Sequence, residues 1–303
     1  MSAARSLPAD LDACVERALA EDVGAGDITA RLVDPNAEAL AVVIARESAV
    51  LCGRPWFDRV FAKLDPKVQV TWEVEEGSSM RTDQRIASLR GPARAVLTGE
   101  RTALNFLQLL SGTATATRRF VERVRGTSVQ IVDTRKTVPG LRSAQKYAVV
   151  CGGGANHRQG LYDAILIKEN HIAAAGGIRQ AIEQARALKA GVPLMTEAEN
   201  LVEVQAALEA NVDLVLLDDF PTHLLSKAVA MAREYRRHNK ARTVLEASGG
   251  VSLTNVRDIA DTGVDRISIG GITKHVTAVD LSMRFVSDLN PEASLDEGSD
   301  PRV

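Results

Sequence analysis

The chain has 303 residues, of which 45% are hydrophobic and 25% are charged, and its formal net charge is −2. These are ordinary values for a globular protein, so a wholly disordered chain is excluded and a sizeable core can be buried. The length fits one α/β barrel of about 250 residues together with a smaller domain.

Membrane and secretory signals are not evident in the sequence. No apolar run approaches the roughly 18 residues that span a bilayer, and residues 1–10 lack an apolar secretory stretch, so we expect a cytoplasmic protein without a membrane partner. Cys14, Cys52 and Cys151 lie far apart and outside any CxxC pattern. We therefore expect buried thiols rather than a disulfide framework or a zinc site.

Positive charge is concentrated in one segment. Between Thr98 and His171 there are eleven Lys or Arg residues against five Asp or Glu residues, within a chain that is slightly acidic overall. Nucleic-acid-binding proteins tend to be basic over a broad face, whereas a local excess is more typical of a focused anion pocket. We expect a small anionic ligand and no nucleic acid.

Residues 1–112 predict a small α+β sandwich domain. The segments Ala9 to Asp22 and Trp56 to Leu64 show helical spacing of apolar residues, while Ala41 to Arg46 and Val68 to Glu75 alternate like half-buried strands. Such a mixture predicts a small sheet with helices on one face.

A helical pattern occupies Gly99 to Arg125, with Leu104, Leu107 and Leu110 on one side. Small residues from Gly112 to Thr117 interrupt it. We therefore expect two helices that join the two domains.

Residues 113–289 alternate short apolar runs with helical segments, which predicts parallel strands covered by helices. The expected strands are Val129 to Asp133, Ala164 to Lys168, Pro193 to Glu197, Leu214 to Asp218, Val244 to Ser248 and Arg266 to Gly270. The expected helices are Ile178 to Ala190, Leu201 to Ala210, His223 to Arg236 and Leu253 to Thr262.

An open α/β barrel of the TIM type is favoured for this second domain. A doubly wound sheet would give the same alternation, but its nucleotide site would need a GxGxxG turn, which is missing here. In this interpretation the last strand of the chain can pack back on the N-terminal domain. Residues 290–303 are acidic and poor in apolar residues, and we expect them to be disordered.

Each expected strand ends in polar residues that burial of the strand does not explain. In a barrel these ends share one face, where the loops build active sites. The positively charged members, with a histidine beside them, are Arg135, Lys136, His157, Arg158 and Lys168, and Thr134 accompanies them. Phosphates and carboxylates are the natural ligands of such a group.

Lys168 ends an apolar run, where an unpaired charge would be costly, so a bound anion or a carboxylate partner is expected there. Lys146 and Arg142, taken singly, are interpreted as solvated surface charges. His157 remains open between a catalytic and a structural role.

Glu197 and Asp218 also end apolar strands. Paired carboxylates near a phosphate site suggest Mg2+, directly or through water or pyrophosphate. The alternative is a buried salt bridge to Lys168 or Arg158.

Glycine pairs follow the last two expected strands. Ser248, Gly249 and Gly250 come after one, and Gly270 and Gly271 come after the other. Bare backbone N–H groups before a helical segment receive phosphate, and glycine permits its close approach. We expect a phosphate cradle there.

Several stretches resemble the quinolinate phosphoribosyltransferase family, also called the carboxylating nicotinate-nucleotide pyrophosphorylases. The resemblance covers about Glu21 to Phe285. It is carried by EDVGAGDIT (21–29), GERTALNFLQLLSGTAT (99–115), DTRKTVPGLRSAQKYAV (133–149), GGGANHRQGLYDAILIKENHI (152–172), LEASGGV (245–251) and ISIGG (267–271).

The resemblance implies transfer of phosphoribose from phosphoribosyl pyrophosphate to quinolinate with Mg2+, giving nicotinate mononucleotide, pyrophosphate and CO2 in NAD biosynthesis. It also implies an N-terminal sandwich domain with an open barrel, and a homodimer, or a higher assembly, in which Arg101 enters the neighbouring active site. The implied catalytic residues are Lys136, Lys168, Glu197 and Asp218. Lys136 and Arg158 would hold the carboxylates, and Lys168 would stabilise the leaving pyrophosphate.

Two positions depart from the family's pattern: Asp219 stands where an Asn is usual, and Gly271 where a small residue such as Ala is common. The extra carboxylate of Asp219 raises the question of altered metal binding. Three other functions stay open: a related phosphoribosyltransferase for another ring acid, a Schiff-base enzyme using Lys168, and a non-catalytic anion-binding barrel.

Overall fold

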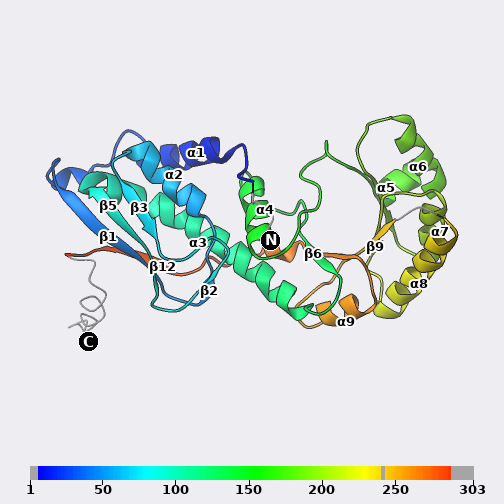
Figure 1. Ribbon diagram of the computed structural model, residues 1–303. Helices are drawn as coiled ribbons and strands as arrows, with labels where there is room; N and C mark the ends of the chain where they lie inside the picture. The colour runs from blue at the N-terminus through cyan, green and yellow to red at the C-terminus, as the bar shows by residue number, and fades with distance from the viewer. Residues whose placement is uncertain (1–5, 240–242, 288–303) are drawn as a thin grey trace. The chain divides into compact units, whose positions relative to one another are not determined.

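The computed structural model describes residues 6–239 and 243–287, which form two compact units (Figure 1). Of the described residues, 6–115 and 276–287 belong to the first unit. The second unit runs from Ala116 to His275. The tail that we expected to be disordered, residues 290–303, lies outside the described residues.

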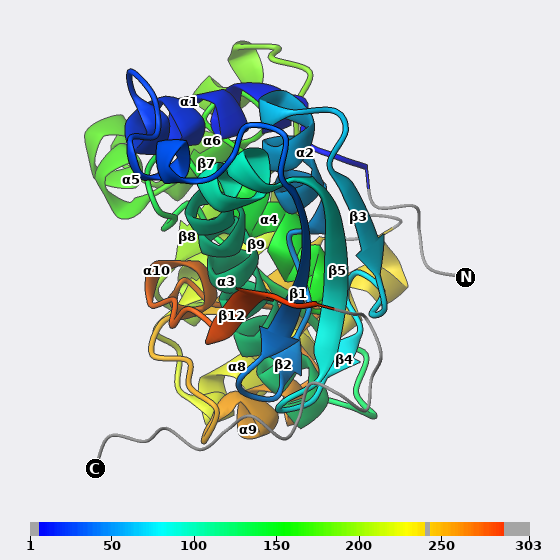
Figure 2. The same ribbon diagram turned by 90° about the vertical axis from the view of Figure 1, so that its left-hand side faces the viewer.

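A four-stranded antiparallel sheet forms the centre of the first unit (Figure 2). Its order is β12 (Leu281–Phe285), β1 (Glu38–Ala45), β5 (Arg85–Pro92) and β3 (Gln69–Trp72). β2 (Ala49–Val50) and β4 (Ser79–Met80) form a separate small ribbon. β1 pairs with a strand on each edge and is mostly buried, which agrees with its near-continuous apolar sequence.

The helical elements of this unit are α1 (Leu11–Val23), the short 3-10 helix η1 (Thr29–Leu32), α2 (Arg54–Leu64) and the first part of α3 (Ala93–Arg123). Helix α2 buries an aromatic group in which the ring of Phe57 lies 5.1 Å from those of Phe61 and Trp72. The predicted α+β sandwich is therefore confirmed.

The expectation of two joining helices is wrong, because α3 is one helix of 31 residues. Gly112, which suggested a break, lies inside it. A Cβ at Gly112 would sit 2.1 Å from the Thr277 carbonyl oxygen, so glycine serves close packing here. Thr113 and Ala114, which follow Gly112, are also buried.

Six parallel strands form the sheet of the second unit. They are β6 (Gln130–Val132), β7 (Ile165–Ile167), β8 (Leu194–Ala198), β9 (Leu214–Asp218), β10 (Val244–Ser248) and β11 (Arg266–Ser268), paired in the order β6-β11-β10-β9-β8-β7. Chain order is kept around the sheet except that β6 joins β11, while β6 and β7 remain edges within the described residues. This is the predicted open α/β barrel.

Helices cover the outside of this sheet (Figure 1). The predicted ones are α6 (Ile178–Ala187), α7 (Leu201–Glu209), α8 (Thr222–His238) and α9 (Val256–Asp261), and the helical segment expected after Gly270 and Gly271 is α10 (Gly271–Lys274). The sequence did not indicate α4 (Arg142–Cys151) or α5 (Glu169–Ala175). Helix α4 was not predicted because Gln145 and Lys146 lie on its buried side and interrupt the apolar periodicity that indicates a helix.

Strand alternation separates two layers of side chains in the barrel. On β10, Leu245 and Ala247 belong to the large core shared with the outer helices, whereas Val244 packs with a small inner cluster. Cys14, Cys52 and Cys151 are buried, as predicted. Within residues 6–239 and 243–287, no helix combines the length and apolar character needed to cross a membrane.

Candidate active site

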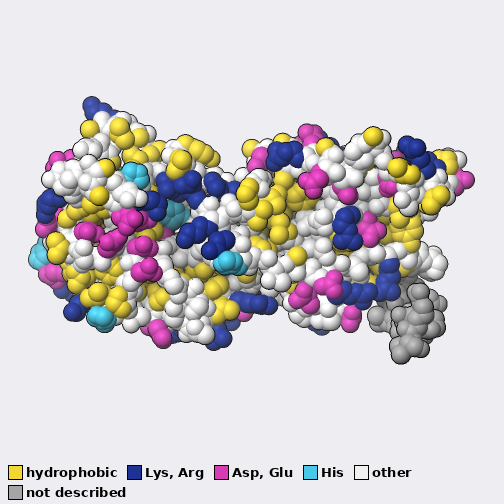
Figure 3. Space-filling view, turned by 180° about the vertical axis from the view of Figure 1, so that it is seen from behind, with side chains coloured by type: hydrophobic (Ala, Val, Ile, Leu, Met, Phe, Trp, Pro, Cys, Tyr) yellow, Lys and Arg dark blue, Asp and Glu magenta, His cyan; other side chains and the backbone are white. Residues whose placement is uncertain are grey.

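The barrel unit contains a cavity of about 780 Å3 lined by residues at and beyond the carboxyl ends of its strands. Parallel strands bring these ends to one face, so residues far apart in sequence meet there. Figure 3 shows a face of this unit on which Asp and Glu side chains gather beside Lys and Arg side chains. Nine predicted site residues line the cavity: Thr134, Arg135, Lys136, His157, Arg158, Lys168, Glu197, Asp218 and Ser248.

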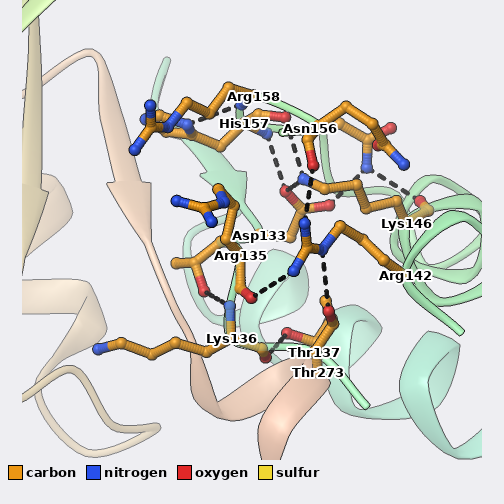
Figure 4. Close-up of polar contacts among 12 residues, drawn as sticks. Asp133, Arg135, Lys136, Thr137, Arg142, Lys146, Asn156, His157, Arg158 and Thr273 are labelled. Carbon is orange, nitrogen blue, oxygen red and sulfur yellow. Dashed lines mark hydrogen bonds and ion pairs between the residues drawn. The ribbon is translucent and has the colours of Figure 1, made fainter. Parts of the chain in front are cut away.

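The loop after β6 carries two of the cations, and its backbone is tied at several points (Figure 4). The Lys136 amide donates to Thr134 Oγ1 at 3.0 Å, and Thr273 Oγ1 donates to the Lys136 carbonyl at 2.8 Å. Arg142 Nη2 donates to the Arg135 carbonyl at 3.3 Å, and its Nε donates to Thr137 Oγ1 at 3.1 Å. Arg142 is therefore a brace for this loop, and its interpretation as a solvated charge is wrong.

Lys146 was also interpreted as a surface charge, which is wrong. Its side chain is 3% exposed and forms an ion pair with the fully buried Asp133. Lys146 Nζ also donates to the His157 carbonyl at 3.0 Å. Burial raises the pKa of the Asp133 carboxyl, against the opposing effect of the Lys146 ammonium.

Asp133 accepts two further hydrogen bonds beside its ion pair with Lys146. Its Oδ1 accepts from the His157 amide at 2.9 Å, and its Oδ2 accepts from Asn156 Nδ2 at 2.6 Å (Figure 4). The Asn156 side chain also donates to the Lys146 carbonyl at 2.9 Å. The turn that carries His157 and Arg158 is thus held in place by a buried polar cluster of Asp133, Lys146 and Asn156.

His157 is held as a neutral imidazole. Its Nδ1 accepts from the Arg158 amide at 2.7 Å, which places the ring hydrogen on Nε2. Nε2 lies 3.5 Å from Oε1 of the buried Glu246. Burial lowers the pKa of His157 to about 4, and the nearby Lys146 and Arg158 act in the same direction.

Lys168 lies one residue beyond β7, and its side chain is 49% exposed, so the premise that it is buried is wrong. The expected carboxylate partner is present, because Nζ lies 2.5 Å from Glu197 Oε1. The Lys168 amide donates to His171 Nδ1 at 3.0 Å, which fixes the start of α5. Lys168 therefore enters the cavity from a capped helix start.

Glu197 and Asp218 project from the ends of β8 and β9 into the cavity. Glu197 is 13% exposed and paired with Lys168, so the salt-bridge alternative holds for one of its oxygens. Asp218 has no ion pair among the residues that the structure describes. Its strand position is level with Ser248 of β10. Such oxygen donors facing a cavity fit a hard cation such as Mg2+.

The glycines after β10 form a tight turn against Asp219. Gly249 has a φ of 92°, and a Cβ there would lie 1.8 Å from Asp219 Oδ1. The Asp219 amide donates to the Ser248 carbonyl at 3.0 Å, with Asp219 itself at a φ of 52°. The helix expected from Leu253 to Thr262 is the shorter α9 (Val256–Asp261), so it does not begin at the turn. Backbone N–H groups, rather than a helix end, are what the turn offers a phosphate.

Gly270 and Gly271 lie at the start of α10, which has four residues. A Cβ at Gly270 would meet Lys136 Cδ at 2.8 Å, so the two strand ends approach closely here. A Cβ at Gly271 would meet only His275 Cδ2, at 3.9 Å. The space at Gly271 would therefore accommodate an Ala side chain.

Ten residues that line the cavity were not predicted as site residues, and two of these are polar residues within strands. Glu246 and Ser268 face the cavity from β10 and β11. Glu246 interrupts the apolar sequence of β10, VLEAS, and this is the signal that could have singled it out. Arg101 is exposed on α3 in the other compact unit, and its role stays a prediction.

Comparison with known proteins gives a consistent family assignment. The model of the quinolinate phosphoribosyl transferase C-terminal domain matches residues 113–284, and that of the N-terminal domain matches residues 27–111. The nicotinate-nucleotide pyrophosphorylase [carboxylating] of Mycobacterium leprae is 40% identical over 89% of this chain and 95% of its own. The enzyme of that name from Rattus norvegicus is 39% identical over 93% of each chain.

A solved structure agrees with these relatives. The nicotinate-nucleotide pyrophosphorylase from Francisella tularensis superposes with a TM-score of 0.87 at 43% identity, covering 93% of this chain and 98% of that one. Fold and cavity together define a two-domain α/β-barrel protein whose cavity is lined by Lys, Arg and carboxylate side chains at the strand ends. The chain belongs to the quinolinate phosphoribosyltransferase family.

Proposed function

We propose that this protein transfers phosphoribose from phosphoribosyl pyrophosphate to quinolinate, releasing pyrophosphate and CO2 and forming nicotinate mononucleotide for NAD biosynthesis. The observation that carries the proposal is the cavity itself. Positively charged side chains occupy its wall beside β6, carboxylates end β8 and β9, and a glycine turn follows β10. A ring diacid, a metal-bound pyrophosphate and a sugar phosphate match these three parts.

The residues act by binding and orientation. Lys136 and Arg158 hold the two ring carboxylates, and Arg135 adds to the positive field on that side. The Ser248–Gly250 turn binds the 5′-phosphate through backbone N–H groups. The ring nitrogen then attacks ribose C1 as pyrophosphate departs, and no protein nucleophile is required.

Lys168 and the carboxylates of Glu197 and Asp218 act on the leaving pyrophosphate. Lys168 stabilises pyrophosphate, and its ion pair with Glu197 keeps it aimed across the cavity. Glu197 and Asp218 would hold Mg2+, directly or through water, and the ion would neutralise charge on the pyrophosphate. Thr134 and His157 shape the acid-binding side.

We also propose a cytoplasmic homodimer in which Arg101 of one subunit enters the neighbouring cavity. The exposure of Arg101 on α3 supports an intermolecular role. An Arg101→Ala subunit mixed with a Lys168→Ala subunit would then form some dimers with one intact site. Recovery of activity on mixing supports the sharing, and its failure with proven mixed dimers contradicts it.

The function is tested by incubating the protein with phosphoribosyl pyrophosphate, Mg2+ and either quinolinate, nicotinate or another pyridine carboxylate. Chromatography should reveal nicotinate mononucleotide with quinolinate and no nucleotide with nicotinate. A nucleotide formed from a different acid would assign the protein to another ring substrate. Consumption of no acid at all would favour a non-catalytic anion-binding barrel.

A further inference from the structure

Glu246 is a buried carboxyl at the wall of the cavity. It is 0% exposed, and neither of its oxygens has a hydrogen-bond partner among the described residues. An ionised carboxylate left in such a place is costly, whereas a protonated one is much less so. The position therefore suits an acid that keeps its proton until a ligand requires it.

The surroundings of Glu246 come from three neighbouring elements. Its neighbours on β10 face the outer core, so its own side chain points into the barrel, where His157 Nε2 lies 3.5 Å from Oε1. Arg266 occupies the register position opposite it on β11. Burial raises the pKa of Glu246 to about 7, with the Ser268 hydroxyl and Arg266 opposing this change and Asp133 adding to it.

The proposed reaction needs such an acid, and the inference rests on that proposed function. The bond between the ring carbon and its carboxylate breaks, CO2 leaves, and the electron pair stays on the carbon beside the quaternary nitrogen. A proton must then bind that carbon to complete the product. The nitrogen stabilises the electron pair but supplies no proton.

The other polar groups of the cavity are less suited to this step. His157 is neutral, and its one ring hydrogen faces Glu246. Lys168 is engaged with Glu197, and arginine does not give up a proton in proteins. Lys136 is exposed and assigned to a ring carboxylate, which leaves it as the rival donor.

We propose that Glu246 donates the proton that replaces CO2 on the ring carbon. Its O–H bond breaks as the new C–H bond forms, and Glu246 is left as a carboxylate facing the N–H of His157. That N–H stabilises the carboxylate until the product leaves, and water then restores the proton. A dianionic ring acid beside Glu246 favours the protonated form at the start of each cycle.

Glu246→Gln keeps the shape of the side chain and removes its carboxylic acid. Glu183→Gln, at an exposed position of α6, is the matched control. The reaction is run in equal volumes of H2O and D2O, and mass spectrometry gives the H:D ratio at the new ring C–H bond. We expect product formation by E246Q to fall on the order of 100-fold, with quinolinate affinity changed by less than about threefold. The ratio in its residual product should differ from that of the original protein.

Product formation by E246Q within about threefold of the original rate, with an unchanged H:D ratio, would overturn the proposal. A loss explained wholly by weaker quinolinate binding would overturn it as well. If E246Q does not fold, the residual product of Lys136→Met decides: the original ratio supports Glu246, and a changed ratio supports Lys136. Failure of the unaltered protein to make nicotinate mononucleotide would instead refute the proposed function.

Discussion

The ammonium group of Lys146 and the carboxylate of Asp133 form a buried ion pair that holds both backbone polar groups of His157. Lys146 binds the carbonyl at 3.0 Å, and Asp133 binds the amide at 2.9 Å (Figure 4). The turn that presents Arg158 to the cavity is thus fixed by charges that do not line the cavity themselves.

Removing one member of this pair should destabilise the protein strongly. Lys146→Met keeps the length of the side chain but leaves Asp133 as an uncompensated buried charge, so we expect the free energy of unfolding to fall by about 3–5 kcal/mol. Urea denaturation measures this change. Lys227→Met, at an exposed position of α8, is the control and should change the free energy of unfolding by less than about 0.5 kcal/mol.

The double variant D133N/K146M separates charge from packing. Because it removes both charges, it should recover part of the stability lost in K146M. A K146M protein as stable as the original, or a double variant that loses the sum of both single losses, would contradict the account of a coupled buried pair.

Glu246 and His157 should give opposing pH dependences of stability. The pKa of Glu246 rises from its usual 4.5 to about 7, so its contribution is complete below pH 4.5 and is lost as the pH rises toward 7. The pKa of His157 falls from 6.5 to about 4, so stability is lost as the pH falls through that range.

Glu246→Gln removes only the first of these two contributions. Relative to the original protein, the free energy of unfolding of E246Q should rise by about 2–3 kcal/mol between pH 5 and pH 8. Denaturation curves at the two pH values measure it. A stability difference that is the same at both would show that Glu246 does not hold a proton in the folded state.

Lys168→Ala should impair catalysis without weakening the fold. The side chain is 49% exposed, and an exposed ion pair contributes only about 0–1 kcal/mol, so the melting temperature should hardly move. The loss of charge opposite the leaving pyrophosphate should lower kcat about 100- to 1,000-fold. Lys227→Ala serves as the control, and near-normal turnover by K168A would refute the assignment.

Gly249→Ala should disturb the phosphate turn. A Cβ would collide with Asp219 Oδ1 at a φ that L-residues rarely adopt, so we expect the KM for phosphoribosyl pyrophosphate to rise at least about tenfold. Gly191→Ala is the control, since Gly191 also has a positive φ but no heavy atom within 4 Å of the added Cβ. Equal kinetics in both variants would argue against phosphate binding at this turn.

The sequence predicted most of the barrel because its strands are short apolar runs and its outer helices have one buried side. It did not predict α4, since buried Gln145 and Lys146 interrupt the pattern that marks a helix. It also misjudged α3, where Gly112 serves close contact with Thr277 rather than a break. Both misses arise from tertiary contacts that leave no local pattern.

The cavity was predictable for a similar reason, because polar residues at consecutive strand ends meet on one face of a barrel. The supporting contacts were not predictable. Arg142 and Lys146 look like ordinary surface charges until α4 is placed beside the loops that contain Asp133 and His157. Likewise, the exposure of Lys168 depends on where β7 ends.

The most direct test of the central claim is the stoichiometry of the reaction with quinolinate labelled in the carboxyl group beside the ring nitrogen. With phosphoribosyl pyrophosphate and Mg2+ present, we expect equal amounts of labelled CO2, pyrophosphate and nicotinate mononucleotide. Pyrophosphate release without labelled CO2, or a nucleotide that retains the label, would contradict a decarboxylating phosphoribosyl transfer by this protein.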